Sequence, residues 1–269
     1  MVRLTREVRF NLPVSADAVA TGGSGHAGTP AADEPSVRWA VRVTFVGEPE
    51  PASSYLIDIK EIDDVVRRSA FPVLCDAVLR PRGLAGVAAD LFAVLRDAWR
   101  GRQAQRVELV VTPQQSLAVN LSEPDMVELS HHFEFSASHR LHNPALSDEQ
   151  NRRLFGKCNN PDGHGHNYEV MVTIAGEPDE NGMLIRLSQL DPLVEEHVLS
   201  KVDHKHLNRQ VHEFQQANPS VENIAMTIHH WLAGHIYPLR KGIWLKSVTV
   251  WETPKTFAEY TSAYPGVHR

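Results

Sequence analysis

Alternating apolar and polar residues mark two pairs of strands, one pair in each half of the chain. The alternation covers residues 8–12 and 39–46 in the first half and residues 133–137 and 168–175 in the second. Successive side chains of a strand point to opposite faces of a sheet, so each segment has one face to bury. The recurrence of the pattern predicts that one architecture is present twice.

Helices and further strands follow in the same order in both halves. The spacing of apolar residues predicts two helices and then a strand in each half, at residues 59–70, 84–99 and 106–112, and again at 188–199, 221–236 and 247–253. Ser188 is the expected N-cap of its helix. We therefore predict an α+β fold of two tandem units, each a four-stranded antiparallel sheet with two helices on one face.

An internal repeat supports the two units and distinguishes their chemistry. Val-Thr-Phe-Val-Gly-Glu-Pro at residues 43–49 returns as Val-Thr-Ile-Ala-Gly-Glu-Pro at residues 172–178. When the strands are aligned, His139 pairs with Val14, His164 with Pro35, His166 with Val37 and Glu252 with Val111. We expect residues 1–122 to form a degenerate unit without metal ligands, with a mobile loop at about residues 15–36, and residues 128–269 to form the catalytic unit.

Composition and charge exclude several classes of protein. Lys and Arg number 27 against 33 Asp and Glu, for a net charge of -6, and no basic stripe points to a nucleic-acid partner. No apolar run approaches the roughly 20 residues that cross a bilayer, and the first residues are charged, which predicts a cytoplasmic protein without a membrane partner. Cys75 and Cys158 are too few for a disulfide framework.

Three histidines have the spacing of metal ligands. His164 and His166 stand two residues apart just before a predicted strand, so their imidazoles point the same way. His139 closes the preceding strand and is the candidate third ligand. Three neutral imidazoles with an open fourth position are typical of catalytic zinc. In a chain with 15 His, ordinary surface histidines are the alternative, but the spacing favours zinc.

Cys158 is the candidate reactive thiol. It lies in Gly-Lys-Cys-Asn-Asn-Pro at residues 156–161, between the proposed ligands. The adjacent Lys157 and a nearby divalent ion would favour the thiolate. A lone cysteine is more often a small buried hydrophobe, and Cys75, which follows the apolar residues 71–74, fits that description.

Five segments of the second half, in this order, have the residues of one enzyme family. They are Phe-Ser-Ala-Ser-His-Arg-Leu at 135–141, Leu-Phe-Gly-Lys-Cys-Asn-Asn-Pro-Asp-Gly-His-Gly-His-Asn-Tyr at 154–168, Val-Asp-His-Lys-His-Leu-Asn at 202–208, Ser-Val-Glu-Asn at 220–223 and Val-Trp-Glu-Thr at 250–253. Over about residues 130–262 the chain resembles the 6-pyruvoyl-tetrahydropterin synthase family. The resemblance implies a tunnelling fold, whose sheets assemble side by side into a barrel. It also implies a homo-oligomer, which for a tandem chain is a trimer of tandems or larger.

The resemblance further implies a reaction and roles for single residues. The family converts 7,8-dihydroneopterin triphosphate to 6-pyruvoyl-tetrahydropterin with loss of triphosphate, which implies a carbon-oxygen lyase with a Zn²⁺ cofactor. Cys158 is the implied base, Asp203 and His204 the implied proton relay, and Glu252 and then Glu222 the implied pterin-binding residues. Each of these roles has a structural alternative. Asp203 could cap a turn, Glu252 could face outward from its strand, and Glu222 could interact favourably with the helix dipole. The resemblance leaves open whether Mg²⁺ accompanies the triphosphate. It also leaves open which basic side chains bind the triphosphate, and the candidates are Lys157, Arg140, Arg152, Arg153 and Lys205.

Other functions share parts of this pattern. The 6-carboxytetrahydropterin synthases of queuosine biosynthesis keep the three His and the Cys and release acetaldehyde, but their Cys is typically closer to His-Gly-His. Here five residues separate Cys158 from His164, which favours the pyruvoyl product. A related aldolase usually has Glu in place of this Cys. A non-catalytic pterin- or metal-binding module is the alternative of another class, but pure binding would not need a proton relay.

Overall fold

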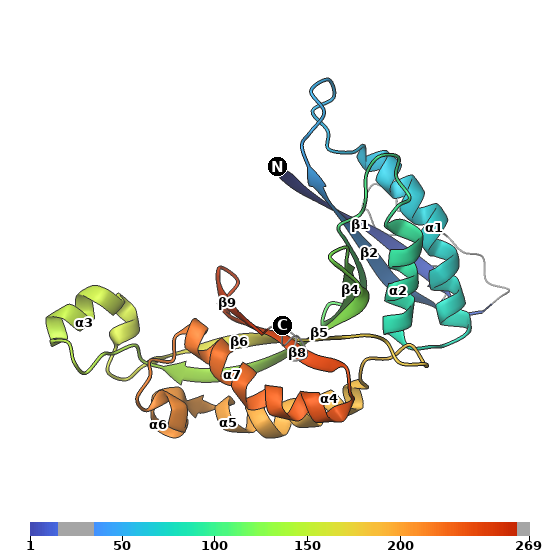
Figure 1. The fold of residues 1–269 in the computed structure, drawn as a ribbon. Coiled ribbons are helices and arrows are strands. Elements are labelled where there is room, and N and C mark those ends of the chain that lie inside the picture. The colour runs from blue at the N-terminus through green and yellow to red at the C-terminus, as the bar shows by residue number, and fades with distance from the viewer. Residues whose placement is uncertain (16–34, 263–269) are drawn as a thin grey trace, which may run out of the picture. The chain divides into compact units, whose positions relative to one another are not determined.

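The computed structural model describes residues 1–15 and 35–262, which form two compact units (Figure 1). Unit 1 contains residues 1–130 together with the segment 175–184, and unit 2 contains residues 131–174 and the chain from residue 185 onward. Most of the predicted loop at residues 15–36 lies outside the described residues. Within the described part of the chain, no helix has the length and hydropathy that a membrane span requires.

Unit 1 is an antiparallel sheet with two helices. Its strands β1 (Val2–Pro13), β2 (Ser36–Gly47), β3 (Arg106–Thr112) and β4 (Gln115–Asn120) follow one another in sequence order across the sheet. The helices α1 (Ile59–Leu79) and α2 (Leu84–Leu95) both lie on one face (Figure 1). Phe10 of β1 meets Phe71 of α1 in a stacked pair, so the apolar face of the sheet and the helices form one core.

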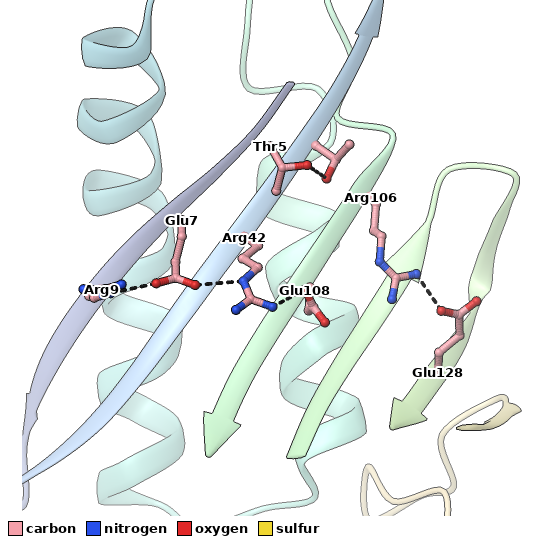
Figure 2. Close-up of polar contacts among 8 residues, drawn as sticks. Thr5, Glu7, Arg9, Arg42, Arg106, Glu108 and Glu128 are labelled. Carbon is pink, nitrogen blue, oxygen red and sulfur yellow. Dashed lines mark hydrogen bonds and ion pairs between the residues drawn. The ribbon is translucent and has the colours of Figure 1, made fainter. Parts of the chain in front are cut away.

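The other face of the unit 1 sheet is polar and bonded across its strands (Figure 2). Arg42 lies between two carboxylates, with its Nε 2.8 Å from Glu7 and its Nη1 3.3 Å from Glu108. Arg106 reaches Glu128 at 2.5 Å. Alternation along each strand therefore divides unit 1 into an apolar side under the helices and a charged side.

The remaining strands belong wholly or mostly to unit 2. β5 (Glu123–His139), β6 (His164–Gly176), β8 (Ile243–Thr253) and β9 (Thr256–Thr261) lie in this order, and the short β7 (Lys205–His206) pairs in parallel with the end of β5. The chain is thus α+β with antiparallel pairing and helices packed on the sheet, as predicted.

The helices of unit 2 include one long interrupted run. α4 (Leu187–Val194) continues through a π-helical turn (Glu195–Leu199) into α5 (Ser200–Val202), and α7 (Val221–Ile236) packs on β8 and β9. Shorter elements are α3 (Asp148–Phe155), a 3-10 turn (Gly156–Asn159), α6 (Leu207–Gln210) and 3-10 turns at His212–Phe214 and Tyr237–Leu239.

The predicted N-cap at Ser188 is wrong. The N-cap is Arg186, and the side chain of Gln189 accepts a hydrogen bond from the Arg186 backbone N–H at 3.2 Å, which begins the helix two residues earlier. α1 likewise continues nine residues past its expected end at Ala70, because Leu74 and Ala77 extend the buried stripe despite Pro72 inside the helix.

Candidate metal centre

Three imidazoles converge where the first two strands of unit 2 meet. His139 is the last residue of β5, and His164 and His166 stand at the start of β6. The Nε2 atoms of His139 and His164 are 3.2 Å apart, and the three ring centroids lie 4.6 to 5.3 Å from one another. The structure therefore brings together the three residues that the sequence proposed as ligands.

Glu252 joins this group from β8. Its Oε1 lies 3.2 Å from His139 Nε2 and 3.4 Å from His166 Nε2, and the candidate ligand atoms of all four residues lie within 4.8 Å of one another. A carboxylate oxygen is itself a common zinc ligand. Proximity of Glu252 to the ligands was not predicted from the sequence, and its assignment to pterin binding stays a prediction.

The protonation of the rings fits a bound cation. His139 Nδ1 lies 2.7 Å from the carbonyl oxygen of Pro219, which can only accept, so Nδ1 donates and Nε2 keeps its lone pair for the centre. Burial lowers the pKa of His139 and of His166, because desolvation disfavours the imidazolium. Neutral imidazoles are the form that binds zinc, so these residues suit such an ion.

A hydrogen-bonded clamp holds the Cys158 loop against the end of β5. The Leu141 N–H donates to the Cys158 carbonyl at 2.8 Å. Arg140 Nε donates to the backbone and side-chain oxygens of the buried Asn159, at 3.2 and 3.1 Å, and His142 Nδ1 lies 3.1 Å from the same Oδ1. The residues after the candidate ligand His139 are thus tied to the residues around the thiol. Sequence reasoning missed Asn159, although it stands next to Cys158.

Comparison with known proteins identifies the family. The family model described as 6-pyruvoyl tetrahydropterin synthase matches residues 128–263, just over half of the 269-residue chain. The chain belongs to this family.

Individual members give the extent of the likeness. The 6-pyruvoyl tetrahydrobiopterin synthase of Homo sapiens is 43% identical over 134 residues, which cover 49% of this chain and 90% of that protein. The 6-carboxy-5,6,7,8-tetrahydropterin synthase of Haemophilus influenzae is 28% identical over 151 residues, 50% of this chain and 99% of that protein. The structure of Caenorhabditis elegans 6-pyruvoyl tetrahydropterin synthase has a TM-score of 0.46 at 36% identity and covers 51% of this chain and 96% of that one.

Asp203 and His204 are a further pair of predicted site residues. Asp203 accepts the Ser136 N–H at 2.9 Å and lies 2.8 Å from His204 Nδ1. The Ser136 N–H and then His204 hold the pKa of Asp203 below its usual range. His204 is exposed, has a positive φ of 54°, and lines a cavity of about 620 Å³ together with the candidate ligand His166. The relay role of Asp203 and His204 stays a prediction.

Glu222 is not part of the four-residue group. It is exposed in the first turn of α7, whose N-cap is Ser220. A carboxylate at this place stabilises a helix N-terminus, so the helix alone accounts for it. The implied pterin-binding role of Glu222 stays a prediction.

Tyr168 is a neighbour of the centre that sequence reasoning overlooked. Its ring is fully buried, stacks on Phe135 at 4.7 Å, and meets His166 and His139 edge-on at 5.5 and 6.1 Å. The signal was present in the sequence, because residue 168 follows His166 by two and therefore points to the same face of β6.

Proposed function

We propose that this protein converts 7,8-dihydroneopterin triphosphate to 6-pyruvoyl-tetrahydropterin, with Zn²⁺ as cofactor and with elimination of triphosphate. The observation that carries the proposal is the convergence of three imidazoles in a chain of the tetrahydropterin synthase family. The loop of Cys158 is hydrogen-bonded to the residues that follow His139. The reaction needs no external reductant, because hydrogens move from the side chain of the substrate into its pyrazine ring while triphosphate leaves.

The proposed metal ligands and the proposed base have separate roles in this reaction. His139, His164 and His166 would hold Zn²⁺, which as a Lewis acid acidifies the substrate positions next to its hydroxyls. Cys158 takes a proton from the side-chain carbon as the base, and its loop is fixed by the bond from Leu141.

The residues proposed for the proton relay and for pterin binding lie on other elements. Asp203 stays ionised and fixes His204 through Nδ1, which leaves Nε2 of this exposed ring free to take up and return a proton. Glu252 binds the pterin ring nitrogen and amino group through its two carboxylate oxygens. Glu222 is a second, weaker candidate for binding the pterin.

A second product is the main alternative. The 6-carboxytetrahydropterin synthase likeness supports a reaction on the same substrate that releases acetaldehyde along with triphosphate. The five-residue separation of Cys158 and His164 favours the pyruvoyl product. A module that binds pterin or metal without turnover is a third candidate.

We also propose that the chain acts as a homo-oligomer, with residues 1–122 as an inert tunnelling-fold unit and residues 128–269 as the catalytic unit. β1 and β9 each pair with one neighbour among the described strands, so each offers an open edge. A trimer of tandems would pair such edges. Native mass spectrometry tests the assembly, and a stable monomer would contradict it.

One incubation separates the candidate functions. The purified protein, loaded with zinc, is mixed with 7,8-dihydroneopterin triphosphate, and the products are identified by mass. We expect 6-pyruvoyl-tetrahydropterin and triphosphate; the carboxy product with acetaldehyde would establish the alternative, and unchanged substrate would leave only binding. Cys158→Ala should abolish turnover and keep the bound zinc, whereas the control Cys75→Ala should keep both, because Cys75 lies on α1 of unit 1. Full activity of Cys158→Ala would refute the assigned base.

A further inference from the structure

Gly163 lies where the backbones of two candidate ligands approach each other. It directly precedes His164, the first residue of β6, and its φ of +76° is in the left-handed region that favours glycine. A Cβ added to Gly163 would lie 2.9 Å from the carbonyl oxygen of His139, the last residue of β5. Real Cβ atoms do not approach other atoms this closely, and a backbone oxygen cannot turn aside as a flexible side chain can.

A second contact limits the space on which Gly163 could draw. The same Cβ would lie 3.2 Å from Nε2 of His206, a residue of β7 that pairs with Ser138 at the end of β5. A side chain at position 163 therefore fits only if this backbone and His139 move apart. Because His164 is joined directly to Gly163, such a movement would separate His164 from His139, whose Nε2 atoms are now 3.2 Å apart.

Gly165, which stands between the two candidate ligands of β6, is not constrained in this way. Its φ lies outside the left-handed region, and an added Cβ would lie 3.5 Å from the Ala137 carbonyl oxygen, an ordinary van der Waals distance. The two glycines flank His164 but differ in what a side chain would meet. The structure thus places the requirement for a bare backbone at Gly163 rather than at Gly165.

The side chain of Asn160 holds Gly163 in its conformation. The Gly163 N–H donates to the Asn160 carbonyl at 2.9 Å, and Asn160 Nδ2 donates to the Gly163 carbonyl at 3.0 Å. The Asp162 N–H donates to Asn160 Oδ1 at 3.3 Å. Asn160 is exposed, so its contribution to the turn comes from these bonds rather than from burial.

We propose that Gly163 and Asn160 are positioning residues for the metal ligands. The bare backbone of Gly163 lets His164 reach His139, and Asn160 fixes the turn from which His164 begins. The inference deepens the proposed zinc site and rests on it. Residues that orient metal ligands without binding the ion typically change metal affinity roughly 10- to 100-fold when they are replaced.

Gly163→Ala tests the inference against two matched variants. Gly165→Ala adds the same methyl group on the other side of His164. Gly242→Ala adds it at a φ of +87° in unit 2, where a Cβ meets no described residue within 4 Å, so it shares the backbone strain of Gly163→Ala without the clash. For each protein we would measure the Kd for Zn²⁺ by competition with a chelating dye and the visible absorption spectrum after loading with Co²⁺, which reports the coordination geometry.

We expect Gly163→Ala to raise the Kd for Zn²⁺ roughly 10- to 100-fold and to change the Co²⁺ spectrum. Gly165→Ala and Gly242→Ala should keep the Kd and the spectrum of the parent. Parental values in Gly163→Ala would overturn the inference, and so would losses of equal size in Gly163→Ala and either matched variant.

Asn160→Ala is the second test, and it decides the inference alone if Gly163→Ala does not fold. It removes both side-chain bonds of the turn and introduces no clash, and its exposed position favours normal folding. We expect weaker Zn²⁺ binding than in the parent, with a smaller loss than in Gly163→Ala. An unchanged Kd in Asn160→Ala would refute the role of Asn160.

These measurements need no pterin, which separates the inference from the proposed function. If the parent binds Zn²⁺ but leaves 7,8-dihydroneopterin triphosphate unchanged, the proposed function fails, and the Zn²⁺ affinities still decide the inference. If the parent is active and Gly163→Ala binds Zn²⁺ equally well, only the inference fails. A parent that binds no Zn²⁺ would overturn both.

Discussion

A glycine contact in unit 1 gives the sharpest test of the structure. Gly83 is the N-cap of α2, and its N–H donates to the Asn181 carbonyl at 2.9 Å. One helical turn later the Gly86 N–H donates to the Gly182 carbonyl, also at 2.9 Å. The segment 175–184, which follows the strand that bears His164 and His166, is thus attached to α2 of unit 1.

Gly83→Ala should break this attachment. The φ of -61° at Gly83 suits alanine, so the backbone itself is not strained. An added Cβ, however, would lie 2.1 Å from the Gly182 oxygen and 2.6 Å from the Asn181 oxygen, far inside any real contact. The turn is closed on itself by bonds between Asp179 and Met183 and cannot shift locally.

The expected cost follows from the bonds lost. If the turn leaves α2, two backbone hydrogen bonds break, and at about 1 to 1.5 kcal/mol each the free energy of unfolding falls by about 2 to 3 kcal/mol. Gly234→Ala is the control, because its Cβ meets nothing within 4 Å in α7. That change should raise stability by about 0.5 to 1 kcal/mol, since alanine favours a helix interior.

Urea denaturation of the two variants and the parent measures both effects. We expect the midpoints to move in opposite directions, downward for Gly83→Ala and upward for Gly234→Ala. If Gly83→Ala costs less than about 1 kcal/mol, the close approach of α2 and the 179–183 turn is not present in the folded protein, and the reasoning fails.

Three further predictions concern the ion pairs and histidines. Glu128→Ala should cost about 2 to 3 kcal/mol in urea denaturation, because it leaves the guanidinium of Arg106 without its buried partner, whereas the exposed Glu48→Ala should change stability by less than about 0.5 kcal/mol. The stability of the zinc-free protein should fall as the pH drops below 6.5, because burial lowers the pKa of His139 and His229 and only the unfolded chain then binds those protons; a flat thermal midpoint from neutral pH to pH 5 would contradict this. His139→Ala should reduce bound zinc, measured by elemental analysis, from about one ion per chain to a small fraction; full retention would exclude His139 as a ligand.

Local spacing was enough to select the three histidines, but it could not give the full group. The positions of His164 and His166 on one strand face follow from the period of two, and His139 follows from its place at a strand end. Glu252 reaches them only because β8 lies beside β6 in the sheet. That neighbour relation depends on tertiary packing, which no local pattern contains.

The ends and interruptions of the helices also depend on tertiary packing, which local sequence patterns do not contain. The helix α1 was expected to end near Ala70, yet the apolar contacts of the following turns maintain the helix past Pro72. The π-helical turn at Glu195–Leu199 was not predicted, because the buried residues Val194, Val198 and Val202 have ordinary helical spacing. Packing, rather than propensity, decides such details.

The hairpins of the two units separate what the fold needs from what the chemistry needs. β3 and β4 shift register between Val110 and Thr112, and β8 and β9 do so between Trp251 and Thr253. In both turns the threonine Oγ1 accepts a backbone N–H two residues later at 3.2 Å, and proline follows the threonine. The residue inside each irregularity is Val111 in unit 1 and Glu252 in unit 2. Because turn and irregularity persist with valine, the carboxylate is not required for the hairpin, and its presence beside three imidazoles is better explained by binding than by folding.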